Sequence, residues 1–424
     1  MTRGISKARL FAALVRACAL AAAACGPGVE EGPIPPATAD TDVDSGADTD
    51  TDTDADTDSD IVPATCPQGP LEWCSWTPDA AHLELLAADV EDGLTFVDAD
   101  YETVLGRRTV LEVPAPVVIV GAVDGENPEP LDAFWRADLA EYDGVPVVPI
   151  AITTRLDAPF DEGGARALIL ARTPSGNSLF RSDAHIGFDG TITPFPGGAV
   201  PGSEALRGLV YLRRKVIDSS PFEADPKFNR VCAFGDGLFC FDGTTWTTEV
   251  PAGSGASLNA VAVIDEGDTA HIIAVGDDGR AVVETDGEWQ ELSLGVVVDL
   301  HAVSAHEGRF TAAGGKGVMI DGTLEDQLVC QLYERALTSL GWIMGPPSES
   351  DDGGVEAPSD DLFVALATDG AILHGDIGVG EGSICDSGDA IPGAMLGRML
   401  DIDYYVLTPQ ALFVRYYGNG AVIE

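Results

Sequence analysis

The residues best placed for chemistry are carboxylates that alternate with small polar residues over positions 48–60. They are Asp48, Asp50, Asp52, Asp54, Asp56, Asp58 and Asp60. The pattern Asp-x-Asp-x-Asp opens the loop of EF-type calcium sites, but this run lacks that loop's central glycine and closing glutamate. We expect no fold to orient these side chains. We therefore predict diffuse, weak calcium binding and no defined metal site.

A group of four cations stands out in so acidic a chain: Arg207, Arg213, Arg214 and Lys215. Such a group could form an anion-binding patch on one face of the protein. The alternative is that these residues balance neighbouring acids on a solvated strand edge. Glycoside hydrolysis would also need two carboxylates about 5 to 10 Å apart. The acids are too numerous for the sequence to single out such a pair.

Other catalytic signals are weak. The chain has no Gly-x-Ser-x-Gly elbow, and His271, His301 and His306 occupy positions typical of strands or turns. The segment "GGKG" (314–317) lacks the spacing of a phosphate-binding loop and reads as a hairpin turn. No catalytic residue and no cofactor is predicted, so an enzymatic role is the less favoured class.

The cysteines indicate an oxidising compartment. Beyond the first 25 residues the chain holds an even set: Cys66, Cys74, Cys232, Cys240, Cys330 and Cys385. No CxxC pair and no zinc-like spacing occurs, so disulfides are expected. Cys232 and Cys240 flank a glycine-rich hairpin and are predicted to face each other. Cys66 and Cys74 bracket a turn, which would leave Cys330 with Cys385, although six cysteines allow fifteen pairings.

The first 25 residues read as an export signal, with a basic start followed by a run rich in Leu and Ala. The apolar run is too short for a membrane span. Its end, Ala22-Ala23-Ala24-Cys25, resembles the lipobox of bacterial lipoproteins, although Leu is usual in place of Ala22. The resemblance implies acylation of Cys25 and attachment to the outer membrane. The alternative is an ordinary secretion signal cut nearby.

The balance of charge excludes some partners. The chain of 424 residues carries 70 acidic and 23 basic residues, a net charge of −47. Such a field repels nucleic acid, so we expect no nucleic-acid partner. Residues 26–65 hold twelve of the acids, no base and few large apolar residues. They are predicted to be a disordered acidic linker between the signal (1–25) and a folded domain (66–424).

Residues 258–292 and 300–322 share a repeat. Each has Leu-x-Ala-Val, a run ending in Ala-x-Gly, a glycine turn, a second apolar run and Asp-Gly. Gly237, Gly279, Gly317, Gly370 and Gly420 mark successive turns, 42, 38, 53 and 50 residues apart. A period of this length with short strands is typical of β-propeller blades. We therefore predict an all-β propeller of about seven four-stranded blades, with six or eight possible.

Two segments depart from the repeat. Residues 127–144 carry Leu131, Phe134, Trp135 and Tyr142 at helix-like spacing, which predicts a short helical insertion on one rim. The last unit ends before the slot of its fourth strand, and "LEWCSWTP" (71–78) resembles that missing strand. We predict that this segment completes the last blade and closes the ring. Alternatively, Trp73 and Trp76 are core aromatics of the first blade.

The unit "AVGDDGRAVVETDGEWQEL" resembles propellers of the BNR/Asp-box and photosystem II assembly-factor-like type. The likeness is good over 230–322 and thin elsewhere. The segment Cys240 to Trp246 is one residue short of an Asp-box, which is a structural turn in any case. The resemblance implies a fold and does not imply sialidase activity.

Together these observations predict a monomeric cell-envelope lipoprotein that presents a propeller on an acidic stalk. Its expected role is non-catalytic binding or scaffolding, with a protein or glycan ligand that the sequence leaves unknown. The ligand-binding loops are expected at 127–144, 193–208 and 346–360. The alternative is an extracytoplasmic glycan-active hydrolase or lyase, and a calcium-responsive surface protein is a weaker third class.

Overall fold

The computed structural model describes the following residues: 66, 84–87, 94–100, 103–110, 113–120, 135–139, 144–155, 166–184, 188–201, 205–212, 230–242, 244–266, 269–306, 308–344, 361–376, 383–391, 393–397, 404–409 and 411–415. They lie in the unit Ile61–Glu424. The predicted signal and linker, the aspartate run and Cys25 lie outside them. Within these ranges no helix is both long and apolar enough to cross a membrane.

The described residues form strands almost throughout. The strands are β1 (Glu84–Ala87), β2 (Leu94–Asp100), β3 (Thr103–Val110), β4 (Val113–Val120), β5 (Trp135–Leu139), β6 (Val148–Arg155), β7 (Arg166–Thr173), β8 (Gly176–Ser182), β9 (Gly190–Ala199), β10 (Leu206–Leu212), β11 (Arg230–Gly235), β12 (Leu238–Phe241), β13 (Trp246–Val250), β14 (Leu258–Asp265), β15 (Ala270–Gly276), β16 (Ala281–Thr285), β17 (Glu288–Glu291), β18 (Leu300–His306), β19 (Arg309–Gly314), β20 (Val318–Gly322), β21 (Gln327–Gln331), β22 (Leu337–Met344), β23 (Asp361–Ala367), β24 (Ala371–Asp376), β25 (Ser383–Ala390), β26 (Met395–Gly397), β27 (Tyr404–Thr408) and β28 (Ala411–Arg415).

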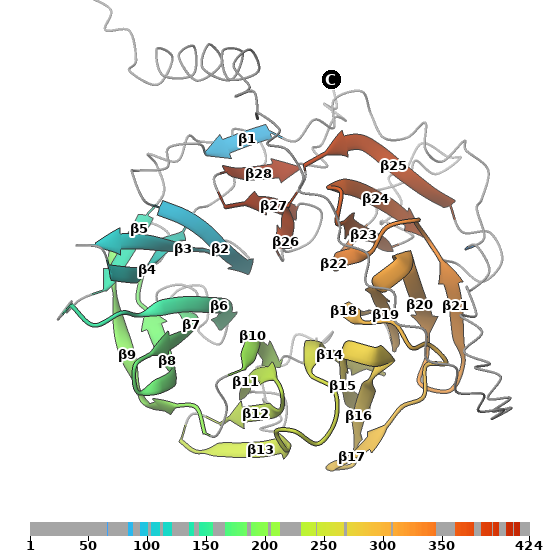
Figure 1. Cartoon of the computed structure of the whole chain (residues 1–424), viewed down its shortest axis with the longest axis horizontal. Coiled ribbons are helices and arrows are strands. Elements are labelled where there is room, and N and C mark those ends of the chain that lie inside the picture. The colour runs from blue at the N-terminus through green and yellow to red at the C-terminus, as the bar shows by residue number, and fades with distance from the viewer. Residues whose placement is uncertain are drawn as a thin grey trace, which may run out of the picture. The chain divides into compact units, whose positions relative to one another are not determined.

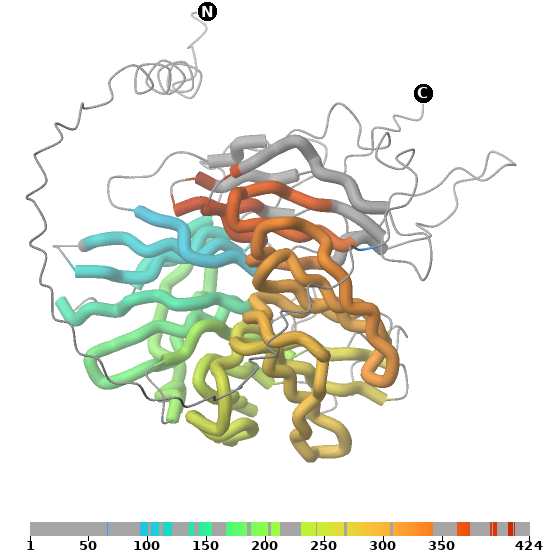
Figure 2. The backbone as a smooth tube through the Cα atoms, turned by 45° about the vertical axis from the view of Figure 1, so that its right-hand side comes forward, coloured from blue at the N-terminus to red at the C-terminus, as the bar shows by residue number. Residues whose placement is uncertain are grey.

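These strands make sheets arranged around a central axis (Figure 1). Four sheets of four consecutive strands run β10–β13, β14–β17, β18–β21 and β22–β25, and the first strand of each lies nearest the axis. The colours of Figure 2 follow one another around the ring, and each of these four sheets comes from one continuous stretch of chain. Neighbouring inner strands contact each other from β2 through β22 to β26. This is a β-propeller, as the repeat predicted.

The first part of the ring in chain order is an eight-stranded sheet. It consists of two antiparallel groups, β2–β5 and β6–β9, which join where β5 pairs in parallel with β9. The helical insertion predicted over 127–144 is wrong at its centre, because Trp135–Leu139 is strand β5. Here Ala137 pairs with Val118 and is fully buried, so ladder pairing on both sides overrides the helix-like spacing of the aromatics.

The ring closes through the N-terminal part of the domain. β1 adds to the outer side of β28 in the sheet ordered β1-β28-β27-β26, with Leu85 opposite Phe413. The expected closure is therefore present, but residues 84–87 make it. The predicted segment 71–78 lies outside the described residues. A second link joins the ends of the ring, since the amide of Phe96 donates to the carbonyl of Pro409 at 3.0 Å.

The repeated glycines occupy the turns between the second and third strands of their sheets. Gly279 and Gly317 end two equivalent 3-10 turns, and both have positive φ, as has Gly370 in the turn before β24. A Cβ added to Gly317 would lie 1.9 Å from the carbonyl oxygen of Tyr333. These turns require glycine both for the backbone angle and for the close approach of the next segment. Gly420 lies outside the described residues.

Disulfides join Cys232 to Cys240 and Cys66 to Cys330. The first pair lies directly opposite on β11 and β12, as predicted. The expected pairing of Cys66 with the nearby Cys74 is wrong, and so is that of Cys330 with Cys385. Instead Cys66 lies beside β21, where its amide donates to the carbonyl of Gln331 at 3.0 Å. Cys74 and the side chain of Cys385 lie outside the described residues.

The hydrophobic cores lie between neighbouring sheets. Ile273 of β15 and Phe310 of β19 share one core, while the Cys232–Cys240 disulfide packs with Ile272 in another. Strands buried on both faces explain the imperfect alternation of polar and apolar residues in the repeat. The predicted loop at 193–208 is largely strand, because β9 and β10 cover 193–199 and 206–208. Residues 346–360 lie outside the described ranges.

Candidate binding site at the central channel

The inner strands of the ring share a local irregularity. In six of the described inner strands one extra residue interrupts the pairing with the second strand of the sheet. The extra residues are Val97, Ile150, Arg207, Asn259, His301 and Thr338. Each follows a buried residue: Phe96, Pro149, Leu206, Leu258, Leu300 or Leu337. A β-bulge of this kind re-aims a side chain, and such bulges are common next to binding sites.

All six bulge residues line one cavity on the axis of the ring, with a volume of about 470 Å³. Cavities of this size accept small molecules or a few residues of a peptide. The bulge residues divide by strand. Val97 and Ile150, on β2 and β6, are apolar, and Met395 and Leu396 of β26 continue that arc. The other four, on β10, β14, β18 and β22, are polar.

Arg207 is the centre of a hydrogen-bond network at the beginning of these strands. Its Nη1 donates to Asp277 at 2.9 Å and also to the side-chain oxygen of Asn259. Asn259 donates in turn to Asp277 at 2.7 Å and to the carbonyl of Leu300 at 2.9 Å. The hydrogen bond from Arg207, assisted by that from Asn259, holds the pKa of Asp277 below its ordinary value. The network joins three neighbouring sheets and fixes Arg207.

The carboxylates of the cavity wall bind to backbone instead of facing a substrate. Asp98 accepts from the amides of Ala99 and Ile152, both at 2.9 Å. Asp100 accepts from the Thr153 hydroxyl at 2.9 Å and the Thr154 amide at 2.7 Å. Both side chains therefore attach β2 to β6. Charge-assisted hydrogen bonds of this kind are among the stronger ones in proteins. Asp98 and Asp100 therefore stabilise the contact between β2 and β6.

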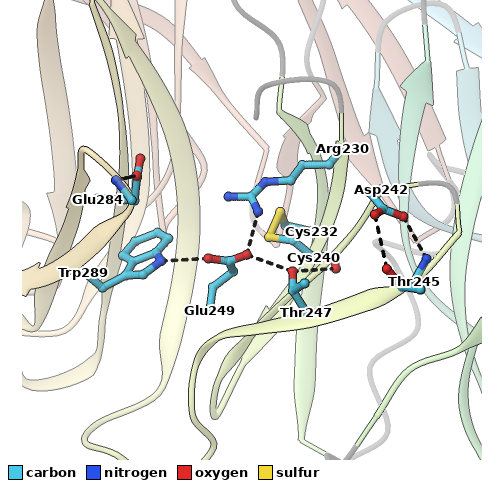
Figure 3. Close-up of polar contacts among 10 residues, drawn as sticks. Arg230, Cys232, Cys240, Asp242, Thr245, Thr247, Glu249, Glu284 and Trp289 are labelled. Carbon is cyan, nitrogen blue, oxygen red and sulfur yellow. Dashed lines mark hydrogen bonds and ion pairs between the residues drawn. A yellow bond between two sulfur atoms is a disulfide. The ribbon is translucent and has the colours of Figure 1, made fainter. Parts of the chain in front are cut away.

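A second carboxylate–arginine pair lies at the outer edge, far along the sheets from the cavity (Figure 3). Glu249 of β13 accepts from Arg230 at 2.5 Å, from Thr247 at 2.8 Å and from the indole N–H of Trp289 at 3.1 Å. Burial raises the pKa of Glu249, but these hydrogen bonds and the charge of Arg230 outweigh it, so the pKa lies below its ordinary value. Arg230 and Thr247 orient Glu249 within its own sheet, and the bond from Trp289 joins that sheet to the next.

The two tryptophans of the repeat each donate a hydrogen bond to the preceding sheet. Trp289 of β17 reaches Glu249 of the preceding sheet, and Trp246 of β13 donates to the carbonyl of Gly197 in β9 at 3.1 Å. The degenerate Asp-box before Trp246 is a turn, as expected. Asp242 accepts from the amide of Thr245 at 2.8 Å (Figure 3) and from that of Thr244 at 2.7 Å, and these bonds lower its pKa.

Of the four cations predicted to form an anion patch, Arg207 alone falls in the described residues, and it lies at the channel. Arg213, Arg214 and Lys215 lie outside them, as do the seven candidate calcium ligands. His301, which was expected to be structural, lines the cavity. Within the described ranges no group of three His, Cys, Asp or Glu is arranged to hold a metal.

Sequence reasoning missed the channel position itself, although the repeat contained a signal. In the shared plan Leu-x-Ala-Val, the variable x is Asn259 in one unit and His301 in the next. The constant residues build the sheet, and x is the bulge residue that lines the cavity. Positions that vary inside an otherwise regular inner strand were the available indication of the site.

Comparison with known proteins finds matches among solved structures. No family model and no curated protein matches this chain. Among solved structures, U3-55K aligns with a TM-score of 0.51 and 11% identity, over 80% of this chain and 99% of that one. The WD40 β-propeller domain of Doa1 aligns at 0.49 and 10%, over 80% and 96%. YCF48 bound to D1 peptide aligns at 0.47 and 10%, over 79% and 96%.

Proposed function

We propose that this protein is a non-catalytic binding or scaffold protein whose ligand sits at the central channel. The observation that carries the proposal is that the carboxylates of the cavity wall bind within the protein, whereas the bulge residues line the cavity. Asp98 and Asp100, the carboxylates of the cavity wall, are held by backbone amides. The six bulge residues, in contrast, are each placed at the cavity wall by a β-bulge in an inner strand. A rigid ring that presents one varied side chain on each of six inner strands is suited to recognition.

Further parts of the proposal concern the whole chain. Counting the two halves of the eight-stranded sheet separately gives a ring of seven four-stranded blades. Residues 26–65 are an acidic stalk, and Cys25 carries a lipid that attaches the protein to the outer membrane of the cell envelope. The propeller acts as a monomer and its ligand is a protein segment or a glycan. The lipobox-like Ala22–Cys25 and the disulfides, which need an oxidising compartment, support this location.

The location is tested by mass spectrometry of the protein from membrane fractions. The expected result is an N-terminal peptide that begins with acylated Cys25. Replacement Cys25→Ser is expected to release the protein into the soluble fraction. A soluble wild-type protein cut at another residue would refute the anchor without affecting the propeller.

The binding role is tested on the full chain carrying Cys25→Ser. It is screened on glycan and peptide arrays, with analysis of products. A channel-filling variant, Ile150→Trp with Thr338→Trp, should lose binding, because both side chains line the cavity. Thr248→Trp, at an exposed position of the outer strand β13, is the matched control and should retain binding. Turnover of a glycan would favour the hydrolase alternative, and binding that survives channel filling would exclude this site.

A further inference from the structure

We propose that Arg207 recognises the carboxylate of a ligand that has an apolar body and lies across the channel mouth. The inference rests on the proposed binding function and names the chemistry of the ligand. Three observations lead to it: the free edge of the Arg207 guanidinium, the use of the wall's acceptors by the protein itself, and the separation of polar and apolar bulge residues around the ring.

Arg207 uses only one nitrogen to hold its place. Nη1 makes the contacts with Asp277 and Asn259. Among the described residues, Nε and Nη2 of Arg207 have no hydrogen-bond partner, and 45% of its side chain is exposed. These two nitrogens form the side-on edge of the guanidinium, which pairs with both oxygens of a carboxylate. The network therefore immobilises Arg207 and leaves a fork directed away from it.

The fixed position of Arg207 favours a role in ligand recognition. An exposed arginine normally loses side-chain entropy when it binds a ligand. The contacts to Asp277 and Asn259 have already fixed Arg207, and Asn259 is itself held by the carbonyl of Leu300. The ligand therefore meets an ordered group. A network that served only to join sheets would need the Asn259 bonds, but it would not need a guanidinium with an unused edge at the cavity.

The donors at the cavity wall complement a ligand that brings acceptors. Asp98 and Asp100 already accept backbone N–H groups, and the Ser339 hydroxyl accepts from the amide of Leu396 at 3.5 Å. The donors of Arg207 remain, and the ring of His301 has no hydrogen-bond partner among the described residues. A ligand that brings acceptors can satisfy these groups.

The apolar body of the ligand follows from the other arc of the ring. Val97 and Ile150 on β2 and β6 adjoin Met395 and Leu396 on β26, and Met395 is 37% exposed. In the order of the ring these strands form one continuous arc, and β10 to β22 form the other. A ligand whose carboxylate contacts Arg207 can bury an aliphatic or aromatic group against this apolar arc.

The net charge of the chain opposes an anion at long range. At an ionic strength of about 0.15 M the screening length is about 8 Å, so distant acids contribute little at the channel. Contacts at the mouth then decide. There the charge of Asp277 is compensated by Arg207, and the Nε–Nη2 edge of Arg207 still has N–H groups to donate to the ligand.

The test compares acids with their neutral amides by calorimetric titration of the full chain carrying Cys25→Ser. Hexanoate and hexanamide represent a free aliphatic acid, and N-acetyl-leucine and its amide represent a peptide C-terminus. The acid of the preferred pair should bind at least about tenfold more tightly than its amide, as expected for a charge-assisted fork. The pair that shows this preference identifies the source of the carboxylate.

Three variants assign the preference to Arg207. Arg207→Met should abolish it, and Arg207→Lys should retain only part, because an ammonium lacks the fork. Arg309→Met is the matched control. Arg309 is 38% exposed and paired with Asp321, as Arg207 is 45% exposed and paired with Asp277, but it does not line the cavity. Thermal unfolding of each variant establishes that it is folded.

The inference is overturned if acid and amide bind equally, if Arg207→Met keeps the preference, or if all four probes fail to bind. Failure of the proposed function looks different. If amides bind without preference and the channel-filling variant loses them, the channel binds ligands but Arg207 does not select a carboxylate. If array ligands bind and channel filling leaves them unaffected, the channel itself is not the site.

Discussion

The outer and inner edges of the sheets use polar groups in opposite ways. At the outer edge, Glu249 accepts from Arg230 and Thr247 of its own sheet and from Trp289 of the next sheet, and the Trp289 contact ties the two sheets together. At the channel, Arg207 is bound through one nitrogen and keeps its other edge open. The outer tryptophans repeat in type, whereas the bulge residues differ from sheet to sheet. Both edges hold the ring together, but the inner edge also keeps donors of Arg207 available for a ligand.

The largest expected effect concerns the outer edge at β21. Cys66 and Cys330 are 264 residues apart in sequence, and in the chain-entropy treatment a loop of this length stabilises the fold by up to about 5 kcal/mol. Replacement of both by Ser should lower the denaturation midpoint strongly. The hairpin disulfide Cys232–Cys240, separated by 8 residues, should contribute about half as much. Chemical denaturation of the two double variants gives the comparison, and equal losses would contradict it.

Trp289→Ala should have the next largest effect. The change removes the indole that packs between two sheets and its hydrogen bond to Glu249, at an expected cost of about 2 to 3 kcal/mol. Trp289→Phe keeps most of the packing and should cost about 1 kcal/mol. Both are measured by urea unfolding. If Trp289→Ala and Trp289→Phe both lower the unfolding free energy only slightly and by the same amount, Trp289 does not join the sheets.

The stability of Glu249→Gln relative to wild type is expected to depend on pH. The folded-state pKa of Glu249 lies below its ordinary value of 4.5, so its charged form stabilises the fold above that pH. This contribution is lost as the pH falls through the folded-state pKa. The variant should be less stable than wild type by about 1 to 2 kcal/mol at pH 7, and the difference should shrink below pH 4.5.

The control for this titration is Glu288→Gln, the same chemical change at an exposed position of β17. Its unfolding free energy should follow that of wild type at every pH. A Glu249→Gln difference that stays constant from pH 7 to pH 3 would show that the charge of Glu249 is not what joins the two sheets.

The smallest effect is expected at the inner edge. Thr338→Val keeps the shape of a half-buried bulge residue and removes a hydroxyl that donates to the carbonyl of Leu366 at 3.2 Å. Unfolding free energy should change by less than about 1 kcal/mol, while ligand binding at the channel should change measurably. A loss of stability comparable to that of Trp289→Ala would erase the distinction between the edges.

The sequence allowed the propeller to be predicted because its turns leave little choice of residue. Gly279, Gly317 and Gly370 need positive φ, and their spacing reports the repeat directly. The hairpin disulfide followed for the same reason, since Cys232 and Cys240 lie in one local element. Closure of the ring was predicted too, but from the likeness of residues 71–78 to another outer strand. Pairing with β28 instead selects residues 84–87.

The channel and the long-range disulfide depend on contacts between distant segments. Nothing near Cys66 in the sequence indicates Cys330, and short separation wrongly favoured Cys74. Arg207 was noted for its charge, but its partner Asp277 lies in another sheet. The register shifts that place the bulge residues at the cavity require the paired strand to be known. Helix-like spacing at 131–142 misled for the same reason, because it ignores the neighbours of β5.

The position of Cys66 has a mechanical consequence. A pull on the proposed stalk reaches Cys66 before it reaches β1, so the disulfide passes the load to β21 and shields the strand that closes the ring. Once the disulfide is reduced, the same load should peel β1 from β28. In single-molecule pulling from residue 61, a reductant is therefore expected to lower the first rupture force, and an unchanged force would refute this load path.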